Sequence, residues 1–245
     1  MSAPGTALVV GGSGVLGAEI AVLLRDRGHS VVVTSTAPID RGTAGMEWVR
    51  FDARDGDATS LVRAIDSFSQ PLDVLVYAAG TSSSKARLAE TPLAESAELF
   101  TINAVGLHAV WRAVCAAARA GETSVLVISS QAAATCTPGN GPYSASKAAL
   151  EAFALTLAKE EAEHGVRVNV LSPSLIASPQ AERVLALKGE HDAEGYYRGL
   201  PWGRALGVAE VAEVAVNVVC DAAWRYASGQ IVRLAADIPQ RGRRP

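Results

Sequence analysis

A tyrosine and a lysine, Tyr143 and Lys147, stand four residues apart at the start of the segment GPYSASKAALEAFALTLAKE. The Ala, Leu and Glu content of this segment predicts a helix, so the two side chains share one face, one turn apart. A free phenol has a pKa of about 10, and a nearby ammonium favours the phenolate. Such a pair could transfer a proton to or from a carbinol oxygen. The same spacing occurs by chance in many helices, so its meaning depends on the rest of the chain.

Closely spaced glycines follow the first apolar run, in the stretch VVGGSGVLG (9–17). A strand, a glycine turn and a helix place backbone N–H groups and the positive end of a helix dipole at one point, where a pyrophosphate can bind. Read from Gly12, the pattern is the dinucleotide fingerprint G-x-G-x-x-G, and read from Gly11 it is G-x-x-G-x-x-G. Both spacings predict a dinucleotide-binding turn. A bare strand-to-helix turn is the alternative.

The end of the second apolar run bears on which dinucleotide binds. An NAD site usually has Asp or Glu about 20 residues after the glycines, where it binds the ribose 2′-hydroxyl. Here the run ends in Thr34-Ser35-Thr36, and Arg41 follows a few residues later. No acid stands there to repel a 2′-phosphate, and the hydroxyls of Ser35 and Thr36 could donate to one. The sequence therefore favours NADP(H) over NAD(H).

These residues need a scaffold, and the chain alternates between strand-like and helix-like segments. Short apolar runs suited to strands buried on both faces of a parallel sheet occupy residues 6–12, 29–35, 72–80, 123–130, 166–174 and 229–236. Helix-like segments occupy residues 15–28, 57–69, 93–120, 144–164 and 208–223. The alternation predicts an α/β fold, a Rossmann-type doubly wound parallel sheet with helices on both faces. Only about a dozen residues separate the second run from VRFDARDG (49–56), so the crossover helix expected there is short or absent.

Length and composition fit one such domain over residues 1–245. The chain is 49% hydrophobic but only 5% aromatic, which suits Ala-rich helices on Val-rich strands. No linker or internal repeat divides it. The longest irregular region, at about 174–205, follows a strand, and ligands of open α/β sheets bind outside the carboxyl ends of the strands. We expect this region to form a lid over a substrate pocket.

Charge and cysteine content argue against other classes of protein. Lys plus Arg number 22 against 25 Asp plus Glu, so no positive field indicates a nucleic-acid partner. Three widely spaced cysteines and four histidines show no metal-ligand spacing, and we predict no metal site. The N-terminal apolar run is interrupted by glycines, and no window approaches the roughly 18 apolar residues of a membrane span. We expect a cytoplasmic protein that does not bind membranes.

The order and spacing of the motifs resemble the short-chain dehydrogenase/reductase family over nearly the whole chain. The matching stretches are the glycine turn, YAAG (77–80), INAVG (102–106), VLVISSQAA (125–133), the Tyr143 and Lys147 pair, and VRVNVLSPS (166–174). Within the family, the chain looks like the 3-oxoacyl-[acyl-carrier-protein] reductase-like ketoreductases. One departure concerns the glycines: usual single-domain members would have them at positions 11, 15 and 17, whereas this chain has Val15 and the spacing of the extended branch.

The resemblance implies four catalytic residues. Tyr143 would be the general acid/base, and Lys147 would bind the nicotinamide ribose and lower the pKa of the tyrosine. Ser130, thirteen residues before the tyrosine, would hydrogen-bond the substrate carbonyl, in preference to its neighbour Ser129. Asn103 would hold a water in the proton relay.

The resemblance also implies a set of cofactor contacts. Asp52 would face the adenine amino group, residues 78–80 would line the adenine ribose, and Ile176 and Ser178 would lie near the nicotinamide carboxamide. The full predicted set is Gly11, Ser13, Gly14, Leu16, Gly17, Ser35, Thr36, Asp52, Ala53, Ala78, Ala79, Gly80, Tyr143, Lys147, Pro173, Ile176 and Ser178.

The expected reaction is hydride transfer from NADPH to a ketone, such as a 3-oxoacyl thioester or another biosynthetic ketone, with Tyr143 as proton donor. The substrate would be a small molecule or a carrier-bound carbonyl. The lid shows no cluster of Lys or Arg, which argues against a highly anionic small substrate. An NAD-dependent alcohol dehydrogenase and a catalytically silent nucleotide-binding module are the alternatives. The family resemblance implies a homotetramer or a homodimer.

Overall fold

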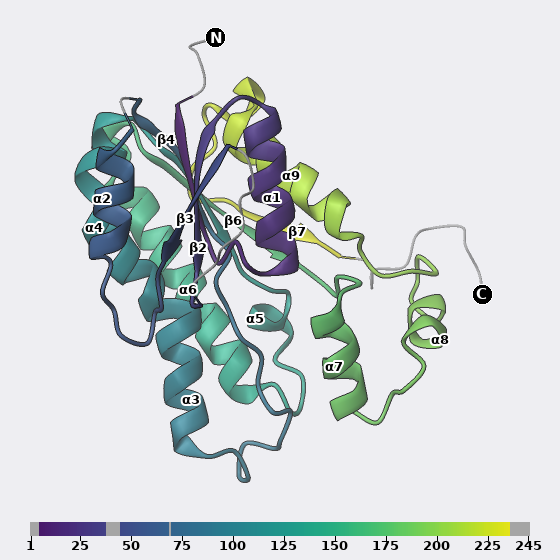
Figure 1. The fold of residues 1–245 in the computed structure, drawn as a ribbon. Helices are drawn as coiled ribbons and strands as arrows, with labels where there is room; N and C mark the ends of the chain where they lie inside the picture. The colour runs from purple at the N-terminus through teal and green to yellow at the C-terminus, as the bar shows by residue number, and fades with distance from the viewer. Residues whose placement is uncertain (1–4, 38–44, 69, 236–245) are drawn as a thin grey trace.

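The computed structural model describes residues 5–37, 45–68 and 70–235 of the chain. Its centre is a sheet of seven strands, all parallel, in the order β3-β2-β1-β4-β5-β6-β7 (Figure 1). The strands are β1 (Thr6–Val10), β2 (Ser30–Ser35), β3 (Met46–Arg50), β4 (Leu72–Tyr77), β5 (Ser124–Ile128), β6 (Arg167–Pro173) and β7 (Ile231–Leu234). The predicted α/β fold, a doubly wound parallel sheet in one domain, is confirmed.

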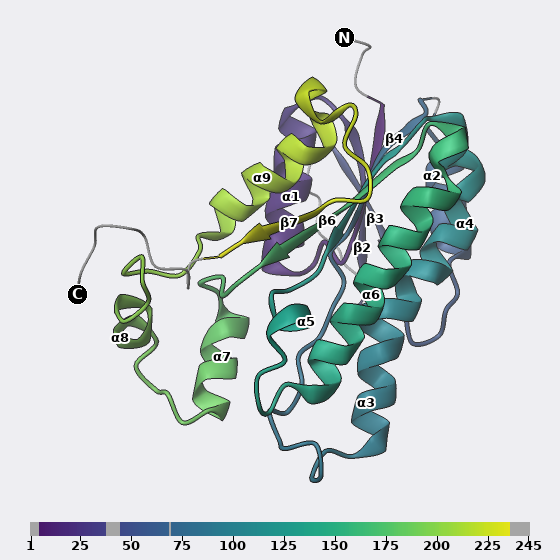
Figure 2. The same cartoon turned by 180° about the vertical axis from the view of Figure 1, so that it is seen from behind.

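Helices cover both faces of the sheet. The helices α1 (Val15–Asp26) and α9 (Val208–Cys220) lie on one face (Figure 1). On the other face lie α2 (Thr59–Asp66), α4 (Gly106–Ala120) and α6 (Gly141–Glu160), which the reverse view brings to the front (Figure 2). The remaining helices, α3 (Leu93–Phe100), α5 (Ala132–Thr135), α7 (Pro179–Leu187) and α8 (Ala193–Arg198), lie beyond the carboxyl edge of the sheet.

Each strand contributes to two cores because successive side chains point to opposite faces. In β1, Leu8 and Val10 pack with the α2, α4 and α6 side, whereas Ala7 and Val9 pack with α1 and α9. All five residues of β1 are fully buried, as expected for a central strand of a parallel sheet. The continuous apolar runs of the sequence therefore come from burial on both faces.

One strand was missing from the sequence prediction. The strand β3 is at the edge of the sheet, and its residues MEWVR are half-buried or exposed, so it lacks the continuous apolar run of the other strands. The predicted short or absent helix between β2 and β3 falls largely on residues 38–44, which lie outside the described residues, as does Arg41.

A long helical run, Leu93–Ala120, joins α3 and α4 through a π-helical turn at Thr101–Val105. By length and composition it is apolar enough to cross a membrane, so the prediction that no window approaches such a length was wrong. The apolar character has a reason in the fold, because Leu107, Val110 and Val114 of α4 pack in the core under the sheet. Helix length and mean hydropathy do not distinguish such a core helix from a membrane span.

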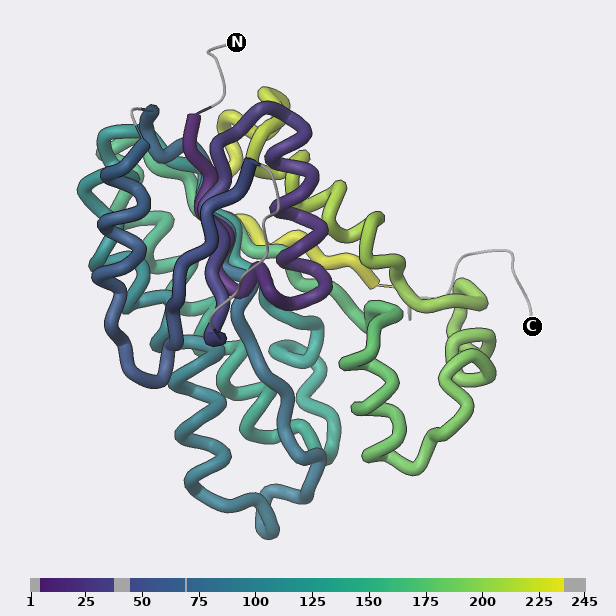
Figure 3. Tube along the Cα trace, viewed as in Figure 1, coloured from purple at the N-terminus to yellow at the C-terminus, as the bar shows by residue number. Residues whose placement is uncertain are grey.

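The polypeptide between β6 and α9, residues 174–207, extends beyond the carboxyl ends of the strands (Figure 3). A backbone bridge pairs Ile176 with Leu206, which joins the two ends of this segment at its base. Its helices α7 and α8 share a small core of their own, built on Leu185, Tyr197 and Ala205. The segment is therefore a compact flap beside the place where an open α/β sheet binds its ligands.

Candidate active site

The glycine turn follows β1 at the point where the chain connections diverge to opposite faces of the sheet. Gly11 has φ +85°, and a Cβ there would lie 2.5 Å from the backbone nitrogen of Ala79, after β4. A Cβ on Gly17 would collide with the carbonyl oxygen of Gly11. The Gly11 N–H donates to Thr34 Oγ1 at 2.9 Å, which ties the turn to β2. Backbone crowding therefore requires glycine at positions 11 and 17.

Gly12 and Gly14 differ from these two positions. A Cβ on Gly12 would collide with a methyl group of Val33, and Gly12 does not line the cavity described below. Gly14 lines that cavity, and a Cβ there would meet only the Gly11 oxygen, at 3.3 Å. The glycines that face the cavity are thus spaced G-x-x-G-x-x-G, and the G-x-G-x-x-G spacing read from Gly12 reflects packing against β2.

The start of α1 is suited to an anion. Gly14 is its N-cap, no side chain caps the helix, and no acidic residue stands in the first turn. The first N–H groups of a helix have no partner within the helix and carry the positive end of its dipole. These N–H groups are therefore available to a pyrophosphate beside the glycine turn.

A single cavity of about 800 Å³ runs from the glycine turn to Tyr143 and Lys147. Every residue of the predicted cofactor set lines it, as does Ser130. The flap contributes Ile176 and Ser178 and, beyond the predicted set, side chains of α7. A dinucleotide needs a phosphate-binding turn and a long, continuous groove, and the residues present fit that requirement. The individual contacts stay predictions.

The end of the cavity near β2 and β3 holds an ion-pair network that sequence reasoning missed. The Asp52 carboxylate accepts hydrogen bonds from Arg54 at 2.8–3.2 Å, and these bonds lower the pKa of Asp52. The same guanidinium lies 3.6 Å from Glu98 on α3. In the sequence, only the closeness of Arg54 to Asp52 could have indicated this network, because Glu98 is distant in the chain and comes near only in the folded structure.

At the other end of the cavity, Tyr143 is hydrogen-bonded to the Ser130 hydroxyl. Burial raises the pKa of Tyr143, and this hydrogen bond opposes the increase. Ser129 instead donates to Glu151 Oε1 at 2.7 Å on α6. The geometry therefore favours Ser130 over Ser129 as the hydroxyl that acts together with the tyrosine.

The Lys147 ammonium is buried and donates to the carbonyl oxygen of Ile128 at 2.9 Å, at the end of β5. Desolvation lowers the pKa of Lys147 to about 8, although the charge of Glu151 acts in the opposite direction. At Tyr143, burial and the Ser130 hydrogen bond are the effects on the pKa, and the expected lowering of this pKa by Lys147 stays a prediction. The ammonium lies close to Gly80, where an added Cβ would be 3.2 Å from Nζ.

Asn103 lies behind the cavity rather than in its lining. Its amide nitrogen donates to the Thr81 carbonyl and to Ser146 Oγ, and its Oδ1 accepts from the Thr81 N–H at 2.7 Å. The residue is fully buried in the π-helical turn. Its side chain therefore joins the loop after β4 to the helix of Tyr143, and its predicted part in a water relay stays a prediction.

A second lysine near the tyrosine was not found from the sequence. Lys85 lies in the loop after β4, and its Nζ is 5.0 Å from the centroid of the Tyr143 ring. The ammonium donates to Asn140 Oδ1 at 2.6 Å, just before α6. Nothing in the stretch SSSKAR (82–87) signals this contact, because the loop and α6 meet only in the folded chain.

The fold and the cavity define a Rossmann-type domain with a groove suited to a dinucleotide. A family model described as enoyl-(acyl carrier protein) reductase matches residues 13–235. The chain belongs to the short-chain dehydrogenase/reductase family, whose members use NAD(P) cofactors.

Individual relatives support this assignment. The chain is 31% identical to cis-4-hydroxycyclohexanecarboxylate dehydrogenase of Sinomonas cyclohexanicum, with 89% of this chain and 90% of the relative covered. It is 27% identical to 3-oxoacyl-[acyl-carrier-protein] reductase of Mus musculus, with 85% and 88% covered. A solved structure of a short chain dehydrogenase/reductase family protein superposes with a TM-score of 0.81 at 28% identity, covering 96% of this chain and 98% of that one.

Alanine substitution distinguishes Gly17, which is crowded by backbone, from Gly14, which has a single contact at 3.3 Å. Gly17→Ala forces a methyl group into the Gly11 carbonyl, so we expect a loss of about 1–3 kcal/mol in the free energy of unfolding. Gly14→Ala is the matched control, because Gly14 has φ −75° and only one contact, and its cost stays below about 1 kcal/mol. Urea unfolding measures both, and equal costs would contradict the assignment of the turn.

The buried ammonium makes a prediction about stability and pH. The pKa of Lys147 is about 8 in the folded chain against an ordinary value of 10.5, so between these values the unfolded state binds more protons and stability rises with pH. Below pH 8 the lysine is charged in both states, and burying its charge lowers the free energy of unfolding by the full amount, on the order of 3 kcal/mol. Lys147→Met removes the penalty but also the hydrogen bond to Ile128, worth about 1 kcal/mol.

We therefore expect the free energy of unfolding of Lys147→Met to exceed that of the wild type by about 2 kcal/mol at pH 7. The difference shrinks as the pH rises from 8 to 10.5, because the wild-type lysine then becomes neutral in both states. Denaturant unfolding of both proteins at several pH values measures it. A variant that is less stable than the wild type by the same amount at every pH would refute the penalty.

Proposed function

We propose that this protein transfers hydride from NADPH to a ketone, with Tyr143 as the proton donor. The observation that carries the proposal is the hydrogen-bonded pair of Tyr143 and Ser130 in the cavity that begins at the glycine turn. A silent nucleotide-binding module has no need of this pair or of a buried lysine beside it. The family supports the oxidoreductase class, and the reductive direction is our inference from the site.

The residues supply a proton and orientation. When bound, the cofactor supplies the hydride chemistry. Tyr143 would donate its proton to the carbonyl oxygen, and the Ser130 hydroxyl would hydrogen-bond that oxygen as negative charge develops on it. Burial raises the pKa of Tyr143, so the phenol is protonated at neutral pH and suits the role of proton donor. Lys147 would hold the nicotinamide ribose, as the family resemblance implies.

The preference for NADP(H) rests on the end of β2. Thr36 is exposed at the cavity, and the Ser35 oxygen accepts the Ala37 N–H at 3.2 Å, which leaves the hydroxyl proton of Ser35 available to a phosphate. The described residues after β2 that line the cavity carry no acid before Asp52, which is engaged by Arg54. These features support a site for a 2′-phosphate.

The substrate is proposed to be a 3-oxoacyl thioester or another biosynthetic ketone, small or carrier-bound, and the relative in Mus musculus supports the first of these. The same residues can run the reverse reaction, so an NAD-dependent alcohol dehydrogenase is the second candidate. The name of the Sinomonas cyclohexanicum relative favours that direction and a hydroxy acid. The two candidates differ in the cofactor that they use and in the substrate that they convert, so both must be measured to choose between them.

We propose that the protein acts in the cytoplasm as a homotetramer or a homodimer. Val105, the residue before α4, and Phe153, on α6, are 46% and 42% exposed, and the Phe153 ring lies 6.3 Å from that of His108 on α4. Exposed apolar side chains gathered on two neighbouring helices support burial against another copy.

Replacement of Tyr143 by Phe removes the proton donor and keeps the ring. We expect turnover of a ketone with NADPH to fall by about 10²- to 10⁴-fold, because general acid catalysis is lost. Dinucleotide affinity, followed by quenching of tryptophan fluorescence, should change little, since Phe keeps the ring and the glycine turn is unchanged. Retained turnover would refute the assignment of the proton donor.

Separate titrations with NADPH and NADH measure the cofactor preference. We expect NADPH to bind at least tenfold more tightly, since a hydrogen-bonded charged group contributes about 1.5–3 kcal/mol. Thr36→Asp is the matched variant, because a carboxylate at this exposed position repels a 2′-phosphate and should reverse the preference. Tighter binding of NADH by the wild type would contradict our reading of Ser35 and Thr36.

A further inference from the structure

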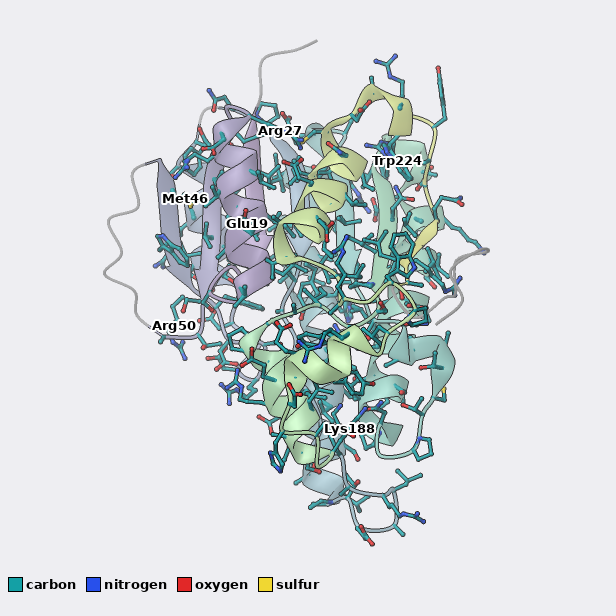
Figure 4. The ribbon with its side chains drawn as sticks, turned by 90° about the vertical axis from the view of Figure 1, so that its right-hand side faces the viewer. Glu19, Arg27, Met46, Arg50, Lys188 and Trp224 are labelled. Atoms are coloured by element: carbon teal, nitrogen blue, oxygen red, sulfur yellow. The ribbon has the colours of Figure 1, made fainter. Side chains whose placement is uncertain are left out.

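Besides Lys147 and Arg54, three cationic side chains line the cavity that contains Tyr143. Lys85 comes from the loop after β4, Arg183 from α7, and Lys188 follows the end of α7. Figure 4 shows Lys188 at the end of the green α7 helix. The sequence shows no cluster here, because Lys85 is about a hundred residues from the other two. The flap and the β4 loop meet only at the cavity.

Lys85 is held beside the proposed proton donor. Its ammonium lies 5.0 Å from the centroid of the Tyr143 ring and donates to Asn140 Oδ1 at 2.6 Å. Asn140 is buried, and its amide nitrogen is in turn bonded to Thr137 Oγ1 at 2.6 Å. The position of the ammonium is therefore set by a chain of hydrogen bonds rather than by a freely moving side chain.

The backbone at Lys85 is strained. Lys85 has φ +69°, a left-handed conformation that residues other than glycine rarely adopt. Gly139, with φ +78°, packs against it so closely that a Cβ there would lie 2.7 Å from the Lys85 carbonyl oxygen. Such strain costs about 1–3 kcal/mol and tends to occur at functional sites. The fold maintains this conformation and thereby directs the lysine toward Tyr143.

Among the described residues, no ion pair neutralises the positive charge of this part of the cavity, although the charge of Glu95 acts on Lys85. Within the described part of the chain, none of the three cations forms an ion pair, and Arg183 donates only to the Pro179 carbonyl, at 3.3 Å. The acids that line the cavity, Asp52 and Glu98, lie by Arg54 at the other end.

Glu95, on α3, accepts the Ser84 N–H at 2.8 Å, so its carboxylate is already engaged by the loop backbone. Burial and the charge of Lys188 lower the pKa of Lys85 to about 8, against the opposing charge of Glu95. Both effects disfavour the ammonium. An anion held there would offset both of them.

We propose that Lys85, Arg183 and Lys188 form a subsite for an anionic group of the substrate, a carboxylate or a phosphate carried by the ketone that Tyr143 protonates. This assignment rests on the proposed reductase function and narrows its substrate class to oxo acids and oxo phosphates. It replaces the expectation, drawn from the flap sequence alone, that a highly anionic small substrate is disfavoured. The anion would lie between the half-buried Lys85 of the β4 loop and the exposed Arg183 and Lys188 of the flap, and charge-assisted hydrogen bonds from these cations would hold it.

Matched pairs of charged and neutral ketones test the subsite. The probes are 4-oxopentanoate against its methyl ester, and dihydroxyacetone phosphate against dihydroxyacetone, each reduced with NADPH. The wild type should prefer one charged member over its neutral partner in kcat/KM. Lys85→Met should reduce that preference about 10- to 100-fold through KM, and Lys188→Met should reduce it by a smaller factor.

Three variants sharpen the kinetic test. Lys85→Arg keeps the positive charge and, like lysine, has a side chain at this left-handed position. It should therefore retain the preference for the charged ketone. Lys159→Met removes an exposed lysine of α6 that does not line the cavity, and should leave it unchanged. A preference in the 4-oxopentanoate pair would identify the bound group as a carboxylate, and a preference in the dihydroxyacetone phosphate pair would identify it as a phosphate. Equal kcat/KM for charged and neutral members, or an equal loss for both in Lys85→Met, would overturn the subsite.

A binding measurement separates failure of the subsite from failure of the proposed reaction. Calorimetric titration of the same charged and neutral ketones into the Tyr143→Phe protein needs no turnover, and Phe keeps the ring beside Lys85. Tighter binding of the charged member that is lost in Lys85→Met supports the subsite even if no ketone is reduced. Absence of that difference overturns the subsite, whereas turnover of the neutral ketones would still support the reductase.

Discussion

The close approach of two backbone segments at the centre of the sheet is the constraint on which the site depends. Gly11 follows β1 and lies against Ala79, which follows the neighbouring strand β4. Gly17 lets α1 begin directly against the Gly11 carbonyl. Because β1 and β4 continue to opposite faces of the sheet, this contact lies at the base of the cavity. A side chain at either glycine would separate the strand ends that the cofactor must bridge.

Burial is the second constraint on the site, and it shifts the pKa values of two neighbouring side chains in opposite directions. It raises the pKa of Tyr143 and lowers that of Lys147, because in each case the neutral form is favoured away from water. The phenol thereby keeps the proton that a reductase must donate. The lysine carries its charge at a cost to stability, which its hydrogen bond to Ile128 only partly offsets. The site is thus a place where function opposes stability.

The loops after β4 and before α6 link the machinery around the tyrosine. Asn103 bonds Thr81 on one side and Ser146 on the other, and Lys85 reaches Asn140 and the Tyr143 ring. Both contacts join the same two segments, so the position of the tyrosine and the charge beside it are set together. In the proposed reaction, the anionic group and the reacting carbonyl of one substrate would meet these two features at once.

The sequence by itself determined the parallel α/β fold, the glycine turn and the pairing of Tyr143 with Lys147, whereas Ser130 came from the family resemblance. Strands buried on both faces produce continuous apolar runs, and residues one helical turn apart share a face, so these features are visible in local patterns. The edge strand β3, half-buried, has no such pattern. The resemblance already favoured the glycine spacing read from Gly11, and the tertiary structure supplied the physical reason, because Gly12 packs on Val33 away from the cavity. The tertiary structure alone brought Arg54 to Glu98, and Lys85 to Tyr143 and the flap, because contacts between distant segments depend on how the helices and loops pack.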